Sequence, residues 1–534
     1  MIFRKDHSLN FIKNINFLKN NKEKTVLLII FTVAFILRII TSFLIATSGV
    51  DDAYTWWILA VETKHNDLIY TDPWGGHDKI WPPFYATVSA FFMMIFFSEK
   101  IWIPKLISVF CGAYAVALTY LITKKIVTSV NKEGLKNSGR SIMDKAPLAA
   151  ALLLAFNPYH IFYTSKSINE PLYSALLLSA IYFLLKAEKA NNYIFLTAVF
   201  LFFASLTRYE IWVLLPFFAW ISLKQGRLTL TKFFASAIIV LSGPFIWILR
   251  QHYVYGSWRD FIEHYTSGGG ASSSSATGDP FLNALFVIST AGVMTFGIAW
   301  FTLIYGWKKL TGSKKKEKVV NGNGIINFRD FEVVYAFFAA YILLMVVSAA
   351  LGVFPAWVRY HIAYIPTVFI IFGIAFAEKI FPLLQKMSKK ASLFSKREFY
   401  ASLLLVQLLL LPAFSLEGKQ QDSIIDAGEI FARQYEGGTI INDLPSFIYG
   451  SGLPIEKFIR SSDIPDETSL WGGYLKSENV TYLVWTNADY AKISDFDENF
   501  IKNNETGVEF ILIYSTNEST SRICNVYKIV DYGI

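Results

Sequence analysis

The feature that most constrains this chain is the number of its apolar runs. Eleven runs can form membrane-spanning helices, at 25–46, 101–123, 146–163, 171–187, 192–206, 211–222, 232–249, 281–306, 332–352, 357–377 and 399–414. A span needs about 20 mostly apolar residues, so the shorter runs leave the exact ends open. A twelfth run, 82–97, begins with two prolines and is barely long enough. We predict a polytopic α-helical membrane protein with 11 spans, or 13 if 82–97 crosses and another span is hidden.

The loops between these runs set the orientation. Residues 1–24, 124–145, 307–330 and 378–398 carry six, six, seven and six Lys or Arg residues. The positive-inside rule places such loops in the cytoplasm, and the alternate loops then face outward. Residues 1–24 are therefore predicted to be a cytoplasmic N-terminal segment, followed by a retained signal anchor.

Residues 416–534 have a different composition. They hold 9 Lys/Arg and 19 Asp/Glu, a net charge of −10, whereas the whole chain is +8 and the remainder therefore +18. Four stretches, IINDL, YLVW, FILIYS and NVYKIV, have the pattern of short buried strands, and helical stretches separate them. We predict an α/β domain at 416–534 on the outer side, and we assign the charge contrast to two compartments and not to nucleic acid.

Ionisable residues gather at the predicted outer ends of the spans. A charge at the lipid boundary is costly unless it pairs or acts. These residues come from five loops: Asp51, Asp52, Lys79, His160, Lys166, Glu170, Arg208, Glu210, Arg250, Arg359 and His361. Their convergence on one side predicts a functional site on the outer face.

Asp51 and Asp52, in the stretch DDAYTWW, follow the first apolar run directly. One interpretation is structural: the acids cap a helix, and Tyr54, Trp56 and Trp57 lie in the lipid headgroups. The other is catalytic, because two adjacent carboxylates repel each other and one pKa can rise toward that of a useful general base. The pair can also bind a divalent metal ion through oxygen ligands, and no other cofactor is indicated.

The basic residues are candidates for binding an anion. Lys79 stands just before the helix that opens at 82–84, and a helix N-terminus favours phosphate. Arg359 stands where another helix is expected to begin, an unfavourable place for a cation, so we expect a bound anion as its partner. Arg208 and Glu210 can also form a purely local pair. Arg38, inside the first span, is expected to snorkel or to pair.

Several short motifs occur in a fixed order: LRII (37–40), DDAY (51–54), PPF (82–84), NPYHIFYTSKSINEP (157–171) and RYHIAYIP (359–366). This order resembles the GT-C superfamily of polyprenyl-phosphate-sugar glycosyltransferases, nearest the branch of protein O-mannosyltransferases and lipid A aminoarabinose transferases. The resemblance covers roughly residues 25–380 and implies a transmembrane catalytic domain over 25–415. Two features depart from the superfamily: Trp81 stands where relatives commonly carry Lys, and the WWDYG motif of oligosaccharyltransferases is absent.

The resemblance implies an enzyme that moves a sugar, with inversion, from a dolichyl- or undecaprenyl-phosphate carrier to an extracytoplasmic protein, lipid or glycan. Asp51 is then the general base, and Asp52 is its partner in metal binding or acceptor positioning. The cations hold the phosphate that leaves, which needs positive charge and no acid. The expected substrate-binding residues are Lys79, His160, Lys166, Glu170, Arg208, Glu210, Arg359 and Tyr360.

Two alternatives stay open. A secondary transporter or lipid flippase usually has internal repeats and midplane charges, and this sequence displays neither pattern. An inactive scaffold of the same fold is opposed only by the adjacent aspartates. The Gly/Ser-rich segment 267–278 fits a lid over the site or a plain linker equally well.

Overall fold

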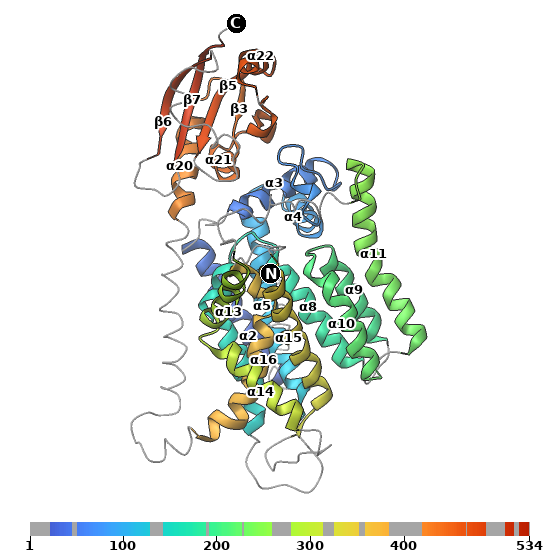
Figure 1. The fold of residues 1–534 in the computed structure, drawn as a ribbon. Helices are drawn as coiled ribbons and strands as arrows, with labels where there is room; N and C mark the ends of the chain where they lie inside the picture. Colours follow the sequence, from blue (N-terminus) through green and yellow to red (C-terminus); the bar gives the residue numbers. More distant parts are fainter. Residues whose placement is uncertain are drawn as a thin grey trace, which may run out of the picture.

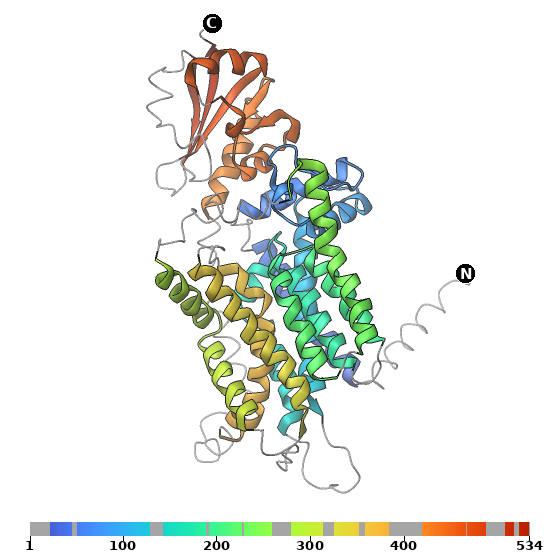
Figure 2. The same cartoon turned by 45° about the vertical axis from the view of Figure 1, so that its right-hand side comes forward.

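The structure is a computed structural model. It describes residues 22–44, 51–128, 142–187, 192–226, 229–258, 279–312, 325–351, 358–383, 419–465, 467–486, 508–516 and 523–532. A bundle of helices forms one part, and a smaller domain with a β-sheet lies beyond one end of the bundle (Figures 1 and 2). We call the sheet-containing part, residues 419–532, the tail domain.

The bundle is formed by helices most of which run roughly along one direction (Figure 1), with bends of 59° between α6 and α7 and 96° between α13 and α14. They are α2 (Lys22–Leu44), α5 (Trp102–Ile126), α6 (Ala146–Ala155), α7 (Pro158–Thr164), α8 (Glu170–Lys186), α9 (Tyr193–Ser205), α10 (Glu210–Lys224), α11 (Leu230–Tyr255), α13 (Pro280–Met294), α14 (Ile298–Gly312), α15 (Phe328–Ala350) and α16 (Ile365–Ala375). Ten of the eleven predicted runs thus contain helix, and the eleventh, 399–414, lies outside the described residues.

The number of spans is harder to fix than the presence of the helices. Five described helices are long and apolar enough to cross a membrane, or up to seven if the bent pairs α6–α7 and α13–α14 each count as one span. Helices α8, α9 and α10 have only 17, 13 and 15 residues. The chain is an integral membrane protein, and the count of 11 or 13 spans stays a prediction.

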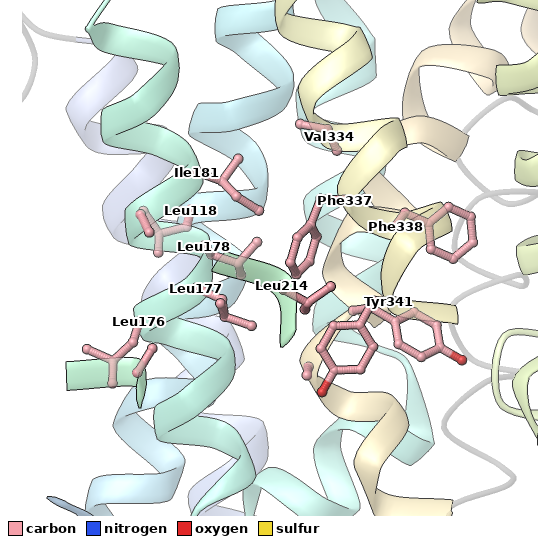
Figure 3. Packing of buried hydrophobic residues seen from close by; sticks show 14 of the residues in the cluster. Leu118, Leu176, Leu177, Leu178, Ile181, Leu214, Val334, Phe337, Phe338 and Tyr341 are labelled. Carbon is pink, nitrogen blue, oxygen red and sulfur yellow. The ribbon is translucent and has the colours of Figure 1, made fainter. Parts of the chain in front are cut away.

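Most of the helices contribute to one large apolar core, whereas α2 and α7 pack in a second cluster with residues of α5, α6 and α16. Helix α8 is buried almost all round, which explains why its sequence has no polar face. Figure 3 shows Leu178 and Ile181 of α8 in this core, with Phe337 and Tyr341 of α15 across from them. Because α8 is central, the residues at its outer end have fixed positions relative to the neighbouring helices.

Two helices lie between the bundle and the tail domain (Figure 1). They are α3 (Asp51–His65) and α4 (Phe84–Ile95), and a short 3-10 helix, His77–Lys79, lies in the loop that joins them. Helix α4 has 12 residues, so it is about 18 Å long and shorter than the hydrocarbon core of a bilayer. Its length fits the prediction in which run 82–97 does not cross.

The tail domain has the α/β architecture that the sequence predicts. Its elements are α20 (Lys419–Ala432), β3 (Thr439–Ile441), α21 (Pro445–Ser451), β4 (Phe458–Ile459), α22 (Trp471–Ser477), β5 (Val480–Thr486), β6 (Glu509–Ser515) and β7 (Cys524–Asp531). The sheet order is β4-β3-β5-β7-β6, with β3 parallel to β4 and β5, and β7 antiparallel to β5 and β6. The two-residue strand β4 was not predicted, because it is too short to carry a pattern.

Candidate active site

Five charged side chains form a connected ion-pair network where the helices reach the end of the bundle nearest the tail domain. Arg359 pairs with Asp52, and its Nε lies 3.2 Å from Oε1 of Glu170. Arg208 donates to the same Glu170 oxygen at 2.8 Å, and its Nη2 lies 2.6 Å from Oε1 of Glu210. We call these five residues the ion network. It unites four separate segments of the chain, all of them predicted to carry outer-face residues.

Local structure explains why the carboxylates stand where they do. Asp52, Glu170 and Glu210 each lie in the first turn of a helix, namely α3, α8 and α10. Negative charge is favourable there because the unpaired backbone N–H groups give this end a partial positive charge. Arg208 lies in the turn between α9 and α10, and Arg359 lies in the 3-10 helix Val358–Ala363 that precedes α16. The arginines therefore come from the connections and the acids from the helix starts.

Tyr360 lies between the two arginines of the ion network. Its ring centre is 4.1 Å from the guanidinium carbon of Arg208 and 5.5 Å from that of Arg359. Both distances fit cation–π contacts, which favour arginine stacked on an aromatic face. Tyr360 thus contacts both arginines, and the structure places it with the residues it was predicted to join.

The ion network carries more negative than positive charge. Three carboxylates face two guanidinium groups, and Glu170, Glu210, Arg208 and Arg359 are all less than 10% exposed. Burial alone would lower the pKa of Arg208, but Glu210 and Glu170 outweigh burial and raise that pKa. Asp52 and Glu170 raise the pKa of Arg359 against burial in the same way. Both arginines therefore stay charged.

The expected partner of Arg359 was a bound anion, which stays a prediction, and the structure adds partners that were not predicted. The partners of Arg359 include the protein's own carboxylates, Asp52 and Glu170. These carboxylates were not predicted as its partners, because the argument considered only the local helix and the acids lie 307 and 189 positions earlier in the sequence. The local pair of Arg208 and Glu210 does form, but as one link of the larger network.

His160 and Lys166, two further predicted site residues, have other neighbours. His160 is buried, and its Nδ1 lies 2.7 Å from Nη2 of Arg38. Arg38 is fully buried and also donates to Thr164, so it pairs instead of snorkelling. The ammonium of Lys166 lies 3.7 Å from the ring centre of Phe162. No contact of these residues with the ion network is among those described, and their predicted role in substrate binding stays a prediction.

Lys79 lies in a second charged cluster, in the loop between α3 and α4. It is exposed, and its ammonium is 5.0 Å from the ring centre of Tyr255 at the end of α11. The preceding residue, Asp78, is 1% exposed and receives hydrogen bonds from Arg250 and Tyr255, both 2.5 Å long. Arg250 also donates to the Tyr70 carbonyl at 2.8 Å. We call Asp78, Arg250 and Tyr255 the loop clamp, because they fix this loop to α11.

The loop clamp was only half anticipated from the sequence. Arg250 was named among the outer-face charges, but Asp78 was not. The available signal was its place beside Lys79 in a predicted outer loop. Among the described residues Lys79 makes no ion pair, and it is exposed, whereas Lys166, Arg208 and Arg359 are buried.

Asp51 is the first residue of α3, but its side chain lies outside the described part of the structure. Its assignment as general base therefore stays a prediction. The expectation that the aromatics of DDAYTWW lie in lipid headgroups is wrong for Tyr54 and Trp56, which are 1% and 3% exposed. Trp56 stacks on Trp81, with ring centres 4.5 Å apart, inside the core.

A metal ion does not fit the described side chains. Among them no group of three His, Cys, Asp or Glu residues is arranged to hold a metal. Asp52 is already paired with Arg359. We therefore assign no step of chemistry to a metal, and the predicted metal binding by Asp51 and Asp52 stays a prediction.

An apolar cavity of about 290 Å³ lies between α9, α10 and α11. Its walls include Leu201 of α9, Trp212 and Ala219 of α10, and Val240 of α11. Trp212 lies in the first turn of α10, close in sequence to Arg208 and Glu210 of the ion network. One wall of the cavity therefore reaches the turn that holds the site.

Comparison with known proteins supports the fold. No family model matches the sequence, and no curated protein matches it. Among solved structures, ArnT from Cupriavidus metallidurans in the apo state aligns over 94% of this chain and 98% of its own, with a TM-score of 0.58 and 12% identity. The same protein bound to undecaprenyl phosphate aligns with a TM-score of 0.53 and 10% identity, over 94% and 97% of the two chains. This chain has the GT-C fold.

A second solved neighbour agrees. The Archaeoglobus fulgidus oligosaccharyltransferase, tethered with an acceptor peptide containing the NVT sequon, aligns over 88% of this chain and 69% of its own. The TM-score is 0.52 and the identity 13%. At such identities the likeness concerns the fold, and the chemistry of this chain has to be argued from its own residues.

Proposed function

We propose that this protein is a membrane glycosyltransferase that moves a sugar from a polyprenyl-phosphate carrier to an extracytoplasmic acceptor, a protein, a lipid or a glycan, with inversion. The observation that carries the proposal is the ion network, which brings acids and cations from four chain segments together at one end of the helix bundle. The solved neighbours support the kind of reaction, since both are glycosyltransferases and one has been seen with undecaprenyl phosphate.

The proposed chemistry needs one base and several cations. The acceptor oxygen attacks the anomeric carbon, its proton goes to the Asp51 carboxylate, and the bond from that carbon to the phosphate oxygen breaks. The phosphate leaves with the electron pair and needs positive charge nearby. Asp52 is next to the base, and its pair with Arg359 fixes the start of α3.

The proposed cations divide into two kinds. Arg208 and Arg359 are already balanced by carboxylates, so they set the geometry and the field of the site. Lys79 is exposed and makes no ion pair among the described residues, so it is the cation best able to receive the lipid phosphate. His160, Lys166, Glu170, Glu210 and Tyr360 complete the proposed substrate-binding set.

The apolar cavity between α9, α10 and α11 is the proposed place for part of the prenyl chain. Its walls are apolar, it is formed by bundle helices, and Trp212 connects it to the turn of Arg208. Filling it with Ala219→Leu should raise the KM for a long-chain donor and leave the KM for a short-chain analogue unchanged. Equal effects on both donors would remove the cavity from the proposal.

The proposed layout has a cytoplasmic segment at 1–24, the catalytic membrane domain at 25–415 and the extracytoplasmic α/β domain at 416–534. The positive charge of loops 124–145, 307–330 and 378–398 supports this orientation. Loop 250–280 carries the Gly/Ser-rich segment 267–278, which lies outside the described residues.

Transfer in purified membranes tests the proposal. A panel of dolichyl- and undecaprenyl-phosphate sugars would be offered to the wild type and to Asp51→Asn, with and without EDTA. Covalent product with the wild type and little with the variant is the expected result. Flux of lipid-linked sugar across the membrane without a covalent product would favour the transporter or flippase. Loss of product in the presence of EDTA would support a role for a metal ion.

A further inference from the structure

Helix α3 presents two opposite faces to two different parts of the molecule. Asp52, Trp56 and Leu59 follow one another at helical spacing and face the bundle, with Asp52 in the ion network and Trp56 and Leu59 in the bundle core. A second stripe at the same spacing faces the tail domain, and its members are Tyr54, Trp57, Ile58 and Val61. The helix that carries the predicted base is therefore held from both sides (Figures 1 and 2).

The tail domain grips α3 mainly through α21. The ring of Tyr449 lies 5.2 Å from the ring of Tyr54 and 5.2 Å from that of Trp57. Ile425 of α20 packs in the same small cluster as Tyr54. Aromatic pairs of this kind are favourable beyond the area that they bury, so Tyr449 is a substantial part of the contact.

A second contact fixes the loop that follows α3. Arg460, just after β4, donates to the Gly75 carbonyl at 3.1 Å. Its guanidinium carbon also lies 5.4 Å from the ring centre of Trp74. Beyond this point the same loop carries Asp78 and Lys79. The tail domain therefore touches both α3, which carries Asp51 and Asp52, and the loop that carries Lys79.

We propose that the tail domain positions the catalytic acids, with Tyr449 and Arg460 as positioning residues that act on α3 and on the loop after it. The inference rests on the proposed function for its effect on transfer. Neither residue touches the reacting atoms: Tyr449 sets the placement of α3, and Arg460 sets that of the loop. A small displacement of a reacting group can lower a rate about 100-fold, so contacts this far from the chemistry can control it.

The test compares two tyrosines of the tail domain. Tyr449→Ala removes a ring that packs on α3, whereas Tyr474→Ala removes a half-buried ring from α22, at the far end of the domain (Figure 1). We expect Tyr449→Ala to lower kcat about tenfold or more, with the donor KM within about twofold of the wild type. Tyr449→Phe should restore kcat, because it keeps the ring, and Tyr474→Ala should leave kcat unchanged.

Hydrogen exchange gives a readout that does not depend on transfer. Amides of α3 should exchange faster in Tyr449→Ala than in the wild type or in Tyr474→Ala. If Tyr449→Ala does not fold, Arg460→Gln serves as the second variant, with faster exchange expected at residues 72–79. Unchanged exchange together with unchanged kcat in Tyr449→Ala and Arg460→Gln would overturn the inference. A wild type that transfers no sugar, but whose α3 loosens on these substitutions, would count against the proposed function alone.

Discussion

The ion network and the loop clamp are both buried charge clusters near the tail-domain end of the bundle, but they differ in balance. In the loop clamp one guanidinium, Arg250, meets one carboxylate, Asp78, and a tyrosine hydroxyl completes the pair. In the ion network two guanidiniums meet three carboxylates. A balanced buried pair fixes a loop and has no remaining charge for a substrate.

This difference in charge balance distinguishes a cluster with a structural role from one that can act on a substrate. Burying a charge costs several kcal/mol, so a balanced pair is sufficient where only a fixed loop is needed. A carboxylate beyond that balance is costly to keep, and the cost is tolerated where the charge can act on a substrate. On this comparison we propose that the loop clamp is structural and that the ion network belongs to the active site. The following predictions test the two assignments.

The largest expected effect is on transfer. Asp51→Asn should lower the rate of sugar transfer by about 10²–10⁴-fold, the usual contribution of a general base. Asp52→Asn should lower it less, because Asp52 orients α3 through Arg359. Asp78→Asn, in the loop clamp, should leave kcat of the folded enzyme within about tenfold of the wild type. Initial rates at saturating donor would measure all three, and equal losses in Asp51→Asn and Asp78→Asn would break the comparison.

The next effect is on stability. Arg208→Met leaves Glu210 buried without its cation and leaves Glu170 with Arg359 alone, and breaking a buried pair in this way costs about 3–5 kcal/mol. Arg250→Met should cost less, because the Arg250 side chain is 20% exposed and Asp78 keeps Tyr255 as a donor. Thermal unfolding of the purified variants in one detergent would rank them. If Arg208→Met has the same melting temperature as the wild type, the ion network does not stabilise the fold as this prediction states.

A smaller effect is expected at Lys79, which lies beside the loop clamp. Lys79→Ala should raise the donor KM about tenfold, the value of one hydrogen bond to a charged group, and leave the melting temperature unchanged because the side chain is exposed. Lys79→Arg should retain most of the affinity. Lys232→Ala, at the opposite end of α11, is the matched control. An unchanged donor KM in Lys79→Ala would move the phosphate site to other cations.

The smallest effect is a pH dependence at Glu62 of α3. Burial, then the nearby Glu456 and Asp72, raise the pKa of Glu62 from 4.5 to about 7, and His65 opposes them. The folded protein therefore holds a proton here that the unfolded chain loses above pH 4.5, so this group's contribution to stability falls as the pH rises from 4.5 to 7.

Glu62→Gln removes that titration. The melting temperature of the wild type should fall, relative to the variant, as the pH is raised through this window. Melting curves for both proteins between pH 5 and pH 8 would measure the difference. If the melting temperatures of the two proteins change with pH in the same way, Glu62 of α3 does not titrate in this window.

Much of the fold follows from local patterns. Hydrophobic runs predicted ten of the described helices or helix pairs. A run of apolar residues can be recognised from the local sequence alone, without knowledge of the parts of the chain that pack against it. Strand patterns predicted β3, β5, β6 and β7, but β4 has two residues and forms only because β3 offers it a parallel partner. The bend of 59° between α6 and α7 falls at Asn157 and Pro158, which lie in a quoted motif but were not predicted to break a helix.

The sequence predicted which residues gather at the site, but it did not predict how they pair with one another. Costly charges at span ends identified Glu170, Arg208, Glu210 and Arg359, because a membrane makes such residues conspicuous. Their pairing was not accessible, since Arg359 meets Asp52 across 307 residues of sequence. Local arguments placed a bound anion beside Arg359, and the structure places carboxylates there.

The sequence by itself determined a membrane bundle, an acidic α/β domain and a group of charges expected on one face, because hydrophobicity and charge act over a few residues. Only the tertiary structure decided that α3 lies between the bundle and the tail domain. Its aromatics looked like headgroup anchors, but Tyr54 is buried against Tyr449 and Trp56 against Trp81. An aromatic side chain satisfies either environment, so its place depends on which surface the fold brings to it.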